Sequence, residues 1–126
     1  MATTSKYLFI ATMNVAPDRD ALFHEIYDSE HVPFLGTVAG VNAIARFENK
    51  DLSAVVGENG PIKSAPNEPR YTAIYEIDGP EVLASDEWSQ MVERGRWPSE
   101  VRPFTSDRRH LLLERLPSAG GDDARR

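Results

Sequence analysis

The chain has 126 residues, of which 40% are hydrophobic and 27% charged, and its formal net charge is −6. This length predicts one domain with its own core, and the acidic balance argues against nucleic acid or an anionic membrane as the main partner. Cysteine is absent, which excludes disulfides, thiolate nucleophiles and zinc–thiolate sites.

The N-terminal residues lack the pattern of a signal peptide, and no run approaches the roughly 20 apolar residues that cross a bilayer. Together with the absence of cysteine, these features lead us to expect a cytoplasmic protein.

The first predicted elements are a strand and an amphipathic helix. Residues 6–14, KYLFIATMN, are apolar on both faces, as in a strand that is covered on both sides. Pro17 suits a first helical turn. The helix should run from Asp18 to about His31, because Phe23, Ile26, Tyr27, Glu30 and His31 follow its apolar spacing. We expect Pro33 to end it, since the residue before a proline avoids the α region.

Two alternating segments predict the next strands. VNAIARFE, residues 41–48, is the first, and RYTAIYEI, residues 70–77, is the second. Residues 49–69 between them are rich in Asn, Gly and Pro and predict a long loop with a short strand at residues 52–56. A loop of this length is either a lid over a site or an insertion.

The last third of the chain predicts two short helices and a strand. Pro80 suits one helix start, and Ser85 before two acidic residues suits a second N-cap, with a kink between the helices. A connector follows Gly95. RRHLLLERL, residues 108–116, predicts the fourth main strand, and residues 117–126 predict a disordered tail.

This order of elements, βαββαβ, predicts an α+β, ferredoxin-like fold, with a four-stranded antiparallel sheet and its helices on one face. Large apolar residues are then left for the bare face. The candidates are Tyr7, Phe9, Phe47, Leu111 and Leu113. A bare apolar face of this size should be covered by a partner. We therefore expect a homodimer in which two sheets face each other about a twofold axis.

Three segments carry a resemblance to a known family. They are YDSEHVPFL (27–35), YTAIYEIDGPEVLASDEW (71–88) and RPFTSDRRHLLLERL (102–116). Through them, most of residues 6–116 resembles the dimeric α/β-barrel superfamily and, within it, the EthD-like group. The resemblance implies a pocket for small organic ligands between sheet and helices, near the end of the first helix. Relatives catalyse polyketide cyclisation, lactone isomerisation, cofactor-free oxygenation, dehydration or haem chemistry, so the fold does not give the reaction.

His31 leads the candidate catalytic residues. Its imidazole suits general acid–base work, it lies on the inward stripe of the helix, and the resemblance places a family histidine there. Otherwise His31 caps the helix or is a satisfied core group. Tyr27 precedes it by one turn, so the two side chains can meet. Tyr75 in the third strand could donate a hydrogen bond to a carbonyl or enolate, although packing alone would also explain either tyrosine.

Six further residues are candidates for substrate contacts. They are Asn14, Glu30, Arg46, Trp88, Trp97 and His110. Each has a structural alternative. Arg46 needs a carboxylate partner, either from the protein or from the substrate. Glu30 points away from His31 if both are helical. The tryptophans could be packing residues, and His110 could be an exposed strand-end residue.

These patterns together predict a cofactor-independent enzyme that acts on a small, largely apolar organic substrate by acid–base catalysis, of the cyclase, isomerase, lyase or dehydratase type. No metal-ligand spacing or nucleotide motif is present, so we expect neither a metal nor a cofactor. The alternatives are a non-catalytic small-molecule-binding protein, a cofactor-free monooxygenase, and a haem enzyme with His31 or His110 as ligand.

Overall fold

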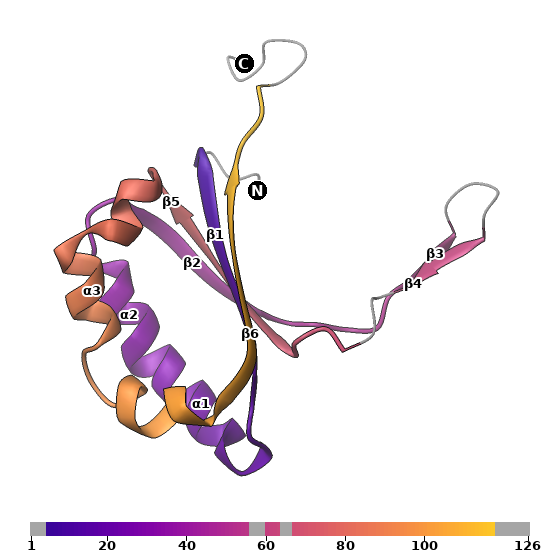
Figure 1. Ribbon diagram of the computed structural model, residues 1–126, viewed down its shortest axis with the longest axis horizontal. Helices are drawn as coiled ribbons and strands as arrows, with labels where there is room; N and C mark the ends of the chain where they lie inside the picture. The colour runs from indigo at the N-terminus through magenta and orange to yellow at the C-terminus, as the bar shows by residue number, and fades with distance from the viewer. Residues whose placement is uncertain (1–4, 56–59, 64–66, 118–126) are drawn as a thin grey trace.

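The main sheet has the predicted ferredoxin-like topology. The computed structural model describes residues 5–55, 60–63 and 67–117. Its four-stranded antiparallel sheet has the order β2-β5-β1-β6, and its helices lie together on one face (Figure 1). The strands are β1 (Tyr7–Val15), β2 (Val41–Glu48), β5 (Tyr71–Ile77) and β6 (Thr105–Glu114). Residues 118–126 of the predicted tail lie outside the described residues.

The first helical segment continues past the predicted stop at Pro33. A 3₁₀ turn (Pro17–Arg19) leads into α1 (Asp20–Ile26), then a π-helical turn (Tyr27–His31), then α2 (Val32–Gly36). In the π turn the Val32 N–H donates to the Tyr27 carbonyl five residues earlier. This wider turn resets the hydrogen-bond register, so Pro33 falls in the first turn of α2, where a missing N–H is tolerated. The prediction that Pro33 ends the helix was therefore wrong.

The second helical segment confirms the predicted kink. A 3₁₀ turn (Pro80–Ala84) is followed by α3 (Asp86–Val92), and the Ser85 hydroxyl between them accepts the Trp88 N–H at 3.1 Å. The expected connector is itself helical, with a π turn (Trp97–Val101) and a 3₁₀ turn (Arg102–Phe104). β6 consequently begins three residues earlier than predicted, at Thr105.

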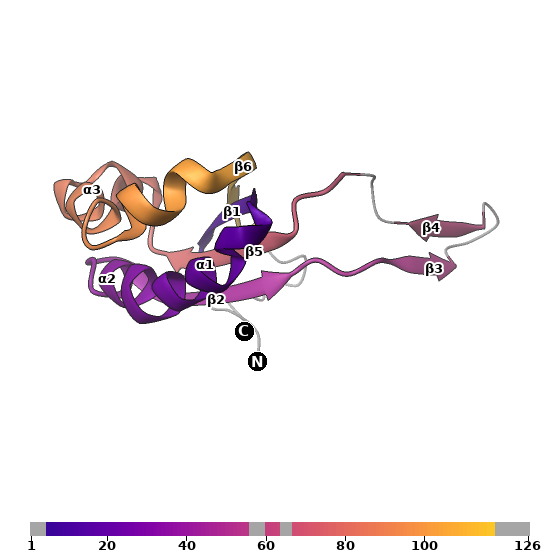
Figure 2. The same cartoon turned by 90° about the horizontal axis from the view of Figure 1, so that it is seen from below.

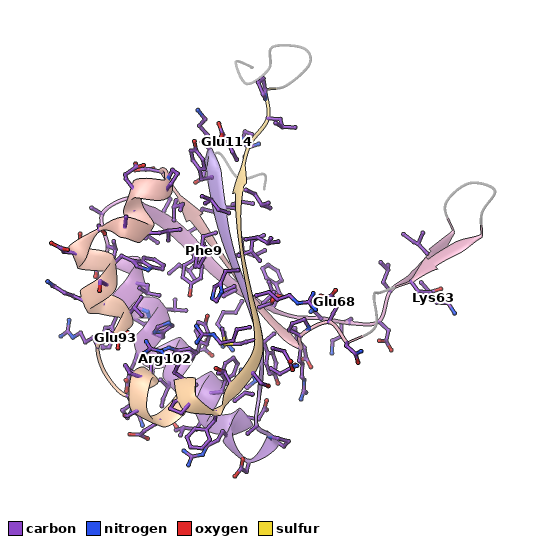
Figure 3. All side chains as sticks on the ribbon, in the orientation of Figure 1. Phe9, Lys63, Glu68, Glu93, Arg102 and Glu114 are labelled. Atoms are coloured by element: carbon purple, nitrogen blue, oxygen red, sulfur yellow. The ribbon has the colours of Figure 1, made fainter. Side chains whose placement is uncertain are left out.

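The segment between β2 and β5 extends away from the main body. It carries a two-stranded hairpin of β3 (Ser53–Val55) and β4 (Pro61–Lys63), which Figure 2 shows projecting beyond the helical layer and the sheet. β3 lies within the strand predicted for residues 52–56, but β4 was not predicted. Lys63 lies on this projection and Glu68 nearer its base (Figure 3).

Strand register decides which side chains face the helices. Every second residue of β5, beginning at Tyr71, is buried, and Tyr75 pairs with Phe9 of β1. Phe9 and Tyr7 therefore belong to the helix side, where both pack against the core. Their assignment to the bare face was wrong, because β1 is apolar on both faces and alternation does not say which face the helices cover.

The opposite face of the sheet is open and apolar. In β1, Leu8 pairs with Leu113 and Ile10 with Leu111. The two β6 leucines are 43% and 56% exposed, and Phe47 of β2 is 52% exposed. These three were predicted for the bare face, and the prediction is confirmed. None of the helices among the described residues is long and apolar enough to cross a membrane.

Candidate active site

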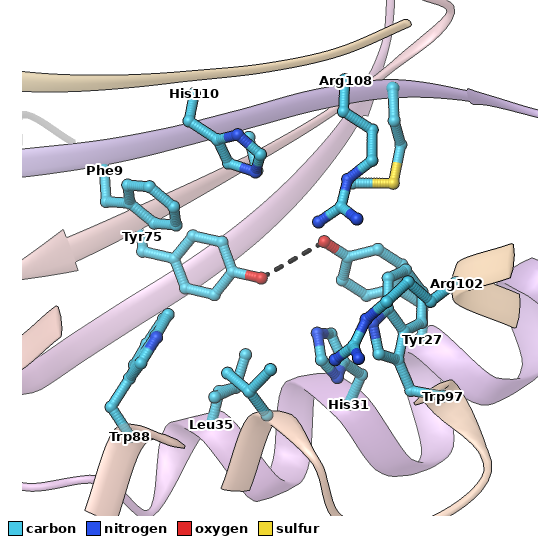
Figure 4. Close-up of a pocket in the computed structure, with 13 residues that line it drawn as sticks. Phe9, Tyr27, His31, Leu35, Tyr75, Trp88, Trp97, Arg102, Arg108 and His110 are labelled. Carbon is cyan, nitrogen blue, oxygen red and sulfur yellow. Dashed lines mark hydrogen bonds between the residues drawn. The ribbon is translucent and has the colours of Figure 1, made fainter. Parts of the chain in front are cut away.

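A cavity of about 140 Å³ lies between the sheet and the helices. Its walls come from β1, β5, β6, both π turns, α2 and α3, so segments far apart in the chain meet there (Figure 4). Six of the nine predicted site residues line it. They are Tyr27, His31, Tyr75, Trp88, Trp97 and His110.

His31 faces this cavity from the end of the first π turn. The residue is only 5% exposed, and its Nδ1 is buried without a hydrogen-bond partner among the described residues. Burial, helped by the positive charges of Arg102 and Arg108, lowers the pKa of His31 to about 4. The imidazole is therefore neutral at pH 7, and its free nitrogen can accept or share a proton.

The two π turns hold His31 in a fixed orientation. Trp97, which begins the second π turn, stacks on the imidazole with a centroid separation of 4.3 Å and an interplanar angle of 16°. The Tyr27 ring meets the imidazole edge-on at 5.2 Å. π-Helical turns are rare and occur frequently at functional sites. Here they bring three aromatic rings together beside one cavity.

Tyr27 and Tyr75 form a buried hydroxyl pair above His31. Their oxygens are 3.2 Å apart. Burial raises the pKa of Tyr27 and, more strongly, that of Tyr75, so both phenols remain protonated near neutral pH. Each phenol has one proton, and only one of them is needed for their mutual bond. The pair therefore retains a donor for an oxygen atom in the cavity.

Two arginines that were not predicted as site residues also line the cavity, Arg102 and Arg108. Arg102 makes a double ion pair with Glu93, with bonds of 3.1 and 2.6 Å, and these two side chains lie beside the helical segments in Figure 3. Arg108 shares its strand face with His110, two residues along β6. This alternation could have predicted that Arg108 lines the cavity. No sequence pattern predicted this for Arg102, because its segment was expected to be an irregular connector.

Three predicted site residues lie outside the cavity lining. Arg46 donates to Asp28 at 2.6 Å, lies 2.7 Å from His24 Nδ1 and covers the Tyr27 ring at 4.4 Å. Of the two carboxylate partners expected for Arg46, one from the protein and one from the substrate, the structure supplies the one from the protein.

Glu30 and Asn14 have structural partners. Glu30 accepts the Arg96 backbone N–H at 2.9 Å and its Nε at 2.7 Å. Gly95, at φ +77°, permits this approach, because a Cβ there would lie 2.5 Å from Glu30 Oε1. Asn14 donates to Asp107 at 2.9 Å and accepts the Arg70 N–H at 2.7 Å.

A second groove, of about 360 Å³, lies between α2 and β2. It is larger, but no titratable side chain lines it. Within the described ranges, no group of three or more potential ligands could hold a metal ion. The His31 cavity has about the volume that encloses a benzene molecule. That volume does not fit a haem.

Comparison with solved structures finds the same fold at very low sequence identity. An EthD family protein from Bacillus halodurans C-125 is 15% identical, with 88% of this chain and 99% of that chain covered and a TM-score of 0.54. SnoaB, a cofactor-independent oxygenase from Streptomyces nogalater, is 12% identical (91% and 97% covered, TM-score 0.56). A dimeric ferredoxin-like protein of unknown function from Thermobifida fusca YX is 10% identical (87% and 91% covered, TM-score 0.52).

The chain therefore has the same ferredoxin-like fold as these proteins, as its sequence predicted. No protein-family model matches the sequence, and the search of curated proteins returned no significant match. Identities at this level establish the fold and leave the reaction to be argued from the site.

Proposed function

We propose that this protein is a cofactor-independent enzyme that binds a small, largely apolar organic molecule and moves a proton on it with His31. One observation carries the proposal. His31 is a buried, neutral imidazole whose Nδ1 has no partner among the described residues, and it borders a cavity lined mainly by aromatic and aliphatic side chains. Buried polar atoms are normally satisfied, so an imidazole without a hydrogen-bond partner beside a cavity suits a ligand that exchanges a proton with it.

The tyrosine pair supplies the second part of the chemistry. In the proposed step, the His31 imidazole takes a proton from a carbon next to a carbonyl, and the electron pair of that C–H bond moves onto the carbonyl oxygen. A hydroxyl of the Tyr27–Tyr75 pair donates to the resulting enolate oxygen. Return of the proton to a different atom completes an isomerisation. Transfer of the proton from the His31 imidazolium to a neighbouring hydroxyl, which leaves as water, completes a dehydration.

The low pKa of His31 sets a condition on this step. A base with a pKa of about 4 is fully available at pH 7 but weak. Negative charge that develops on the substrate offsets the field of the two arginines and so strengthens the base as the reaction proceeds. The site therefore suits a reaction through an enolate, in which negative charge develops on the substrate as the proton leaves.

The proposal is tested by hydrogen–deuterium exchange. Single-ring ketones and β-keto compounds are incubated with the protein in D₂O, and deuterium uptake at the acidic carbon is followed by NMR. We expect exchange with the wild-type protein, loss of 100-fold or more in His31→Gln, as expected on order of magnitude for an acid–base group, and retention in His24→Gln. His24 lies on the same helical segment outside the cavity lining. Undiminished exchange in a folded His31→Gln variant would refute the role of His31.

The same assay separates the alternative functions. A binding or accessory protein would bind these compounds and exchange no hydrogen. A cofactor-free monooxygenase would consume oxygen and yield an oxidised product in air but only exchange under argon. Acid–base catalysis and cofactor-free oxygenation both begin with removal of a proton to form an electron-rich enolate. His31→Gln should therefore suppress both activities.

We further propose that two copies associate through their open sheet faces. The support is the exposed apolar surface around Phe47, Leu111 and Leu113, which would expose hydrophobic side chains in a monomer. Sedimentation at micromolar concentration should show a dimer for the wild type and a monomer for the double variant Leu111→Asp/Leu113→Asp. A monomeric wild-type protein would refute this association.

A further inference from the structure

The His31 cavity is positively charged within an acidic protein. The chain carries a formal charge of −6, yet none of the described residues that line the cavity is a carboxylate, whereas Arg102 and Arg108 both line it. Arg102 is paired with Glu93 through two hydrogen bonds, whereas Arg108 has no such partner among the described residues.

Arg108 has no hydrogen bond or ion pair with any residue in the described part of the chain. A guanidinium normally finds a carboxylate or phosphate that matches its planar fork, and the neighbouring Arg109 does reach Glu68 at 3.4 Å. In Figure 4 the Arg108 side chain points into the space between Tyr27, His31 and His110. Arg108 is exposed, lines the cavity and is unpaired among the described residues, so its planar fork is free to bind an anion there.

A β-bulge holds Arg108 in this position. The register between β1 and β6 shifts between Thr12 and Asn14, so Asp107 and Arg108 together lie opposite Met13. Asp107 has a left-handed backbone (φ 53°), and its carboxylate accepts a hydrogen bond from Asn14 at 2.9 Å. Bulges of this kind re-aim a side chain next to a site. Asn14, which was predicted to bind substrate, thus hydrogen-bonds the residue next to Arg108 in the bulge.

We propose that the ligand of this cavity is a monoanion with a single apolar or aromatic ring, and that Arg108 binds its carboxylate or phenolate oxygen. If the anion is the substrate of a reaction, this proposal rests on the proposed function. The proposal that an anion binds here does not depend on any reaction. A volume of about 140 Å³ holds one ring, since about 150 Å³ encloses benzene. The walls offer rings to stack on, including Phe9, Trp88 and Tyr75, which pack edge-on or tilted against one another.

Charge at this position also discriminates between ligands. Arg108 is exposed at the cavity, so a neutral molecule of the same shape would fill the ring space and leave its guanidinium bound only to water. An anion adds a charge-assisted hydrogen bond that the neutral molecule lacks, and the site therefore favours the anion. Anion binding should also raise the pKa of His31, because it offsets one of the two positive charges that lower it.

Benzoate and its neutral isostere benzamide test the inference by calorimetric titration. We expect wild-type protein to bind benzoate at least tenfold more tightly than benzamide. In Arg108→Gln, benzoate affinity should fall about 10- to 100-fold, the range for a hydrogen bond to a charged group, while benzamide affinity stays unchanged. Arg108→Lys should recover part of the loss. Arg94→Gln removes the same charge from a residue that lies over Phe34, outside the cavity lining, and should bind as wild type does.

Each outcome decides between the two proposals. Equal affinity for benzoate and benzamide, or an equal loss in Arg108→Gln and Arg94→Gln, would overturn the anion assignment and leave the acid–base role of His31 standing. Selective binding of benzoate through Arg108, with no deuterium exchange for any anionic keto compound, would support the anion site and overturn the enzymatic proposal.

Discussion

Acidification should destabilise this protein specifically through His31. The imidazole has a pKa of about 4 in the folded protein and about 6.5 when exposed in the unfolded chain. Between these two values the unfolded chain binds a proton that the folded protein rejects. The free energy of unfolding therefore rises with pH across this window, and the contribution of His31, fully present above pH 6.5, is lost as the pH falls towards 4.

The size of this loss follows from the two pKa values. Each unit of pKa difference corresponds to about 1.4 kcal/mol, so the contribution of His31 amounts to about 3 kcal/mol over the whole window. The residue is 5% exposed, and screening by solvent therefore reduces the value little. Small domains have a total stability of about 5–15 kcal/mol, so the effect is large enough to measure.

The assay is urea unfolding at pH 7.5, 6.5, 5.5 and 4.5, with wild-type protein and His31→Asn at one fixed protein concentration. Carboxylates also titrate in this range, but they do so in both proteins, and the repacking cost of asparagine does not depend on pH. The stability difference between the two proteins should therefore change by about 2 kcal/mol between pH 6.5 and 4.5 in favour of the variant. His24→Asn should retain the wild-type slope, because His31 is still present. A difference that stays constant across all four pH values would refute the claim that burial keeps His31 neutral.

Three further substitutions test the site and its supports. Tyr75→Phe removes one hydroxyl of the buried pair; it should cost about 1 kcal/mol in urea unfolding and slow deuterium exchange about 100- to 1000-fold, whereas unchanged exchange would remove Tyr75 from the chemistry. Glu30→Gln should leave exchange at the wild-type rate, because Glu30 binds Arg96 outside the cavity lining, and a large loss would restore it as a catalytic candidate. Ser85→Ala should lower thermal stability by about 1 kcal/mol through loss of the α3 cap, and no change would mean that the cap is energetically irrelevant.

The sequence alone determined the order of elements and most of their bounds. Period-two alternation in residues 41–48 and 70–77 and a capping signal at Ser85 are local properties, which neighbouring residues specify directly. They were sufficient for the ferredoxin-like topology and for placing Tyr27 and His31 on one stripe. Pro33 shows the limit of local rules. A proline normally stops a helix, but here a π turn before it shifts the register so that the missing N–H costs nothing.

Only the tertiary structure decided which residues meet in the cavity. Alternation groups side chains into two faces but does not say which face the helices cover, and β1 is apolar on both. Asn14, Glu30 and Arg46 found partners within the protein at distances of 2.6–2.9 Å. The direction of the Arg108 side chain depends on a bulge that forms only when β6 pairs with β1. Long-range pairing thus set the charge of the site, while local pattern had set its histidine and tyrosines.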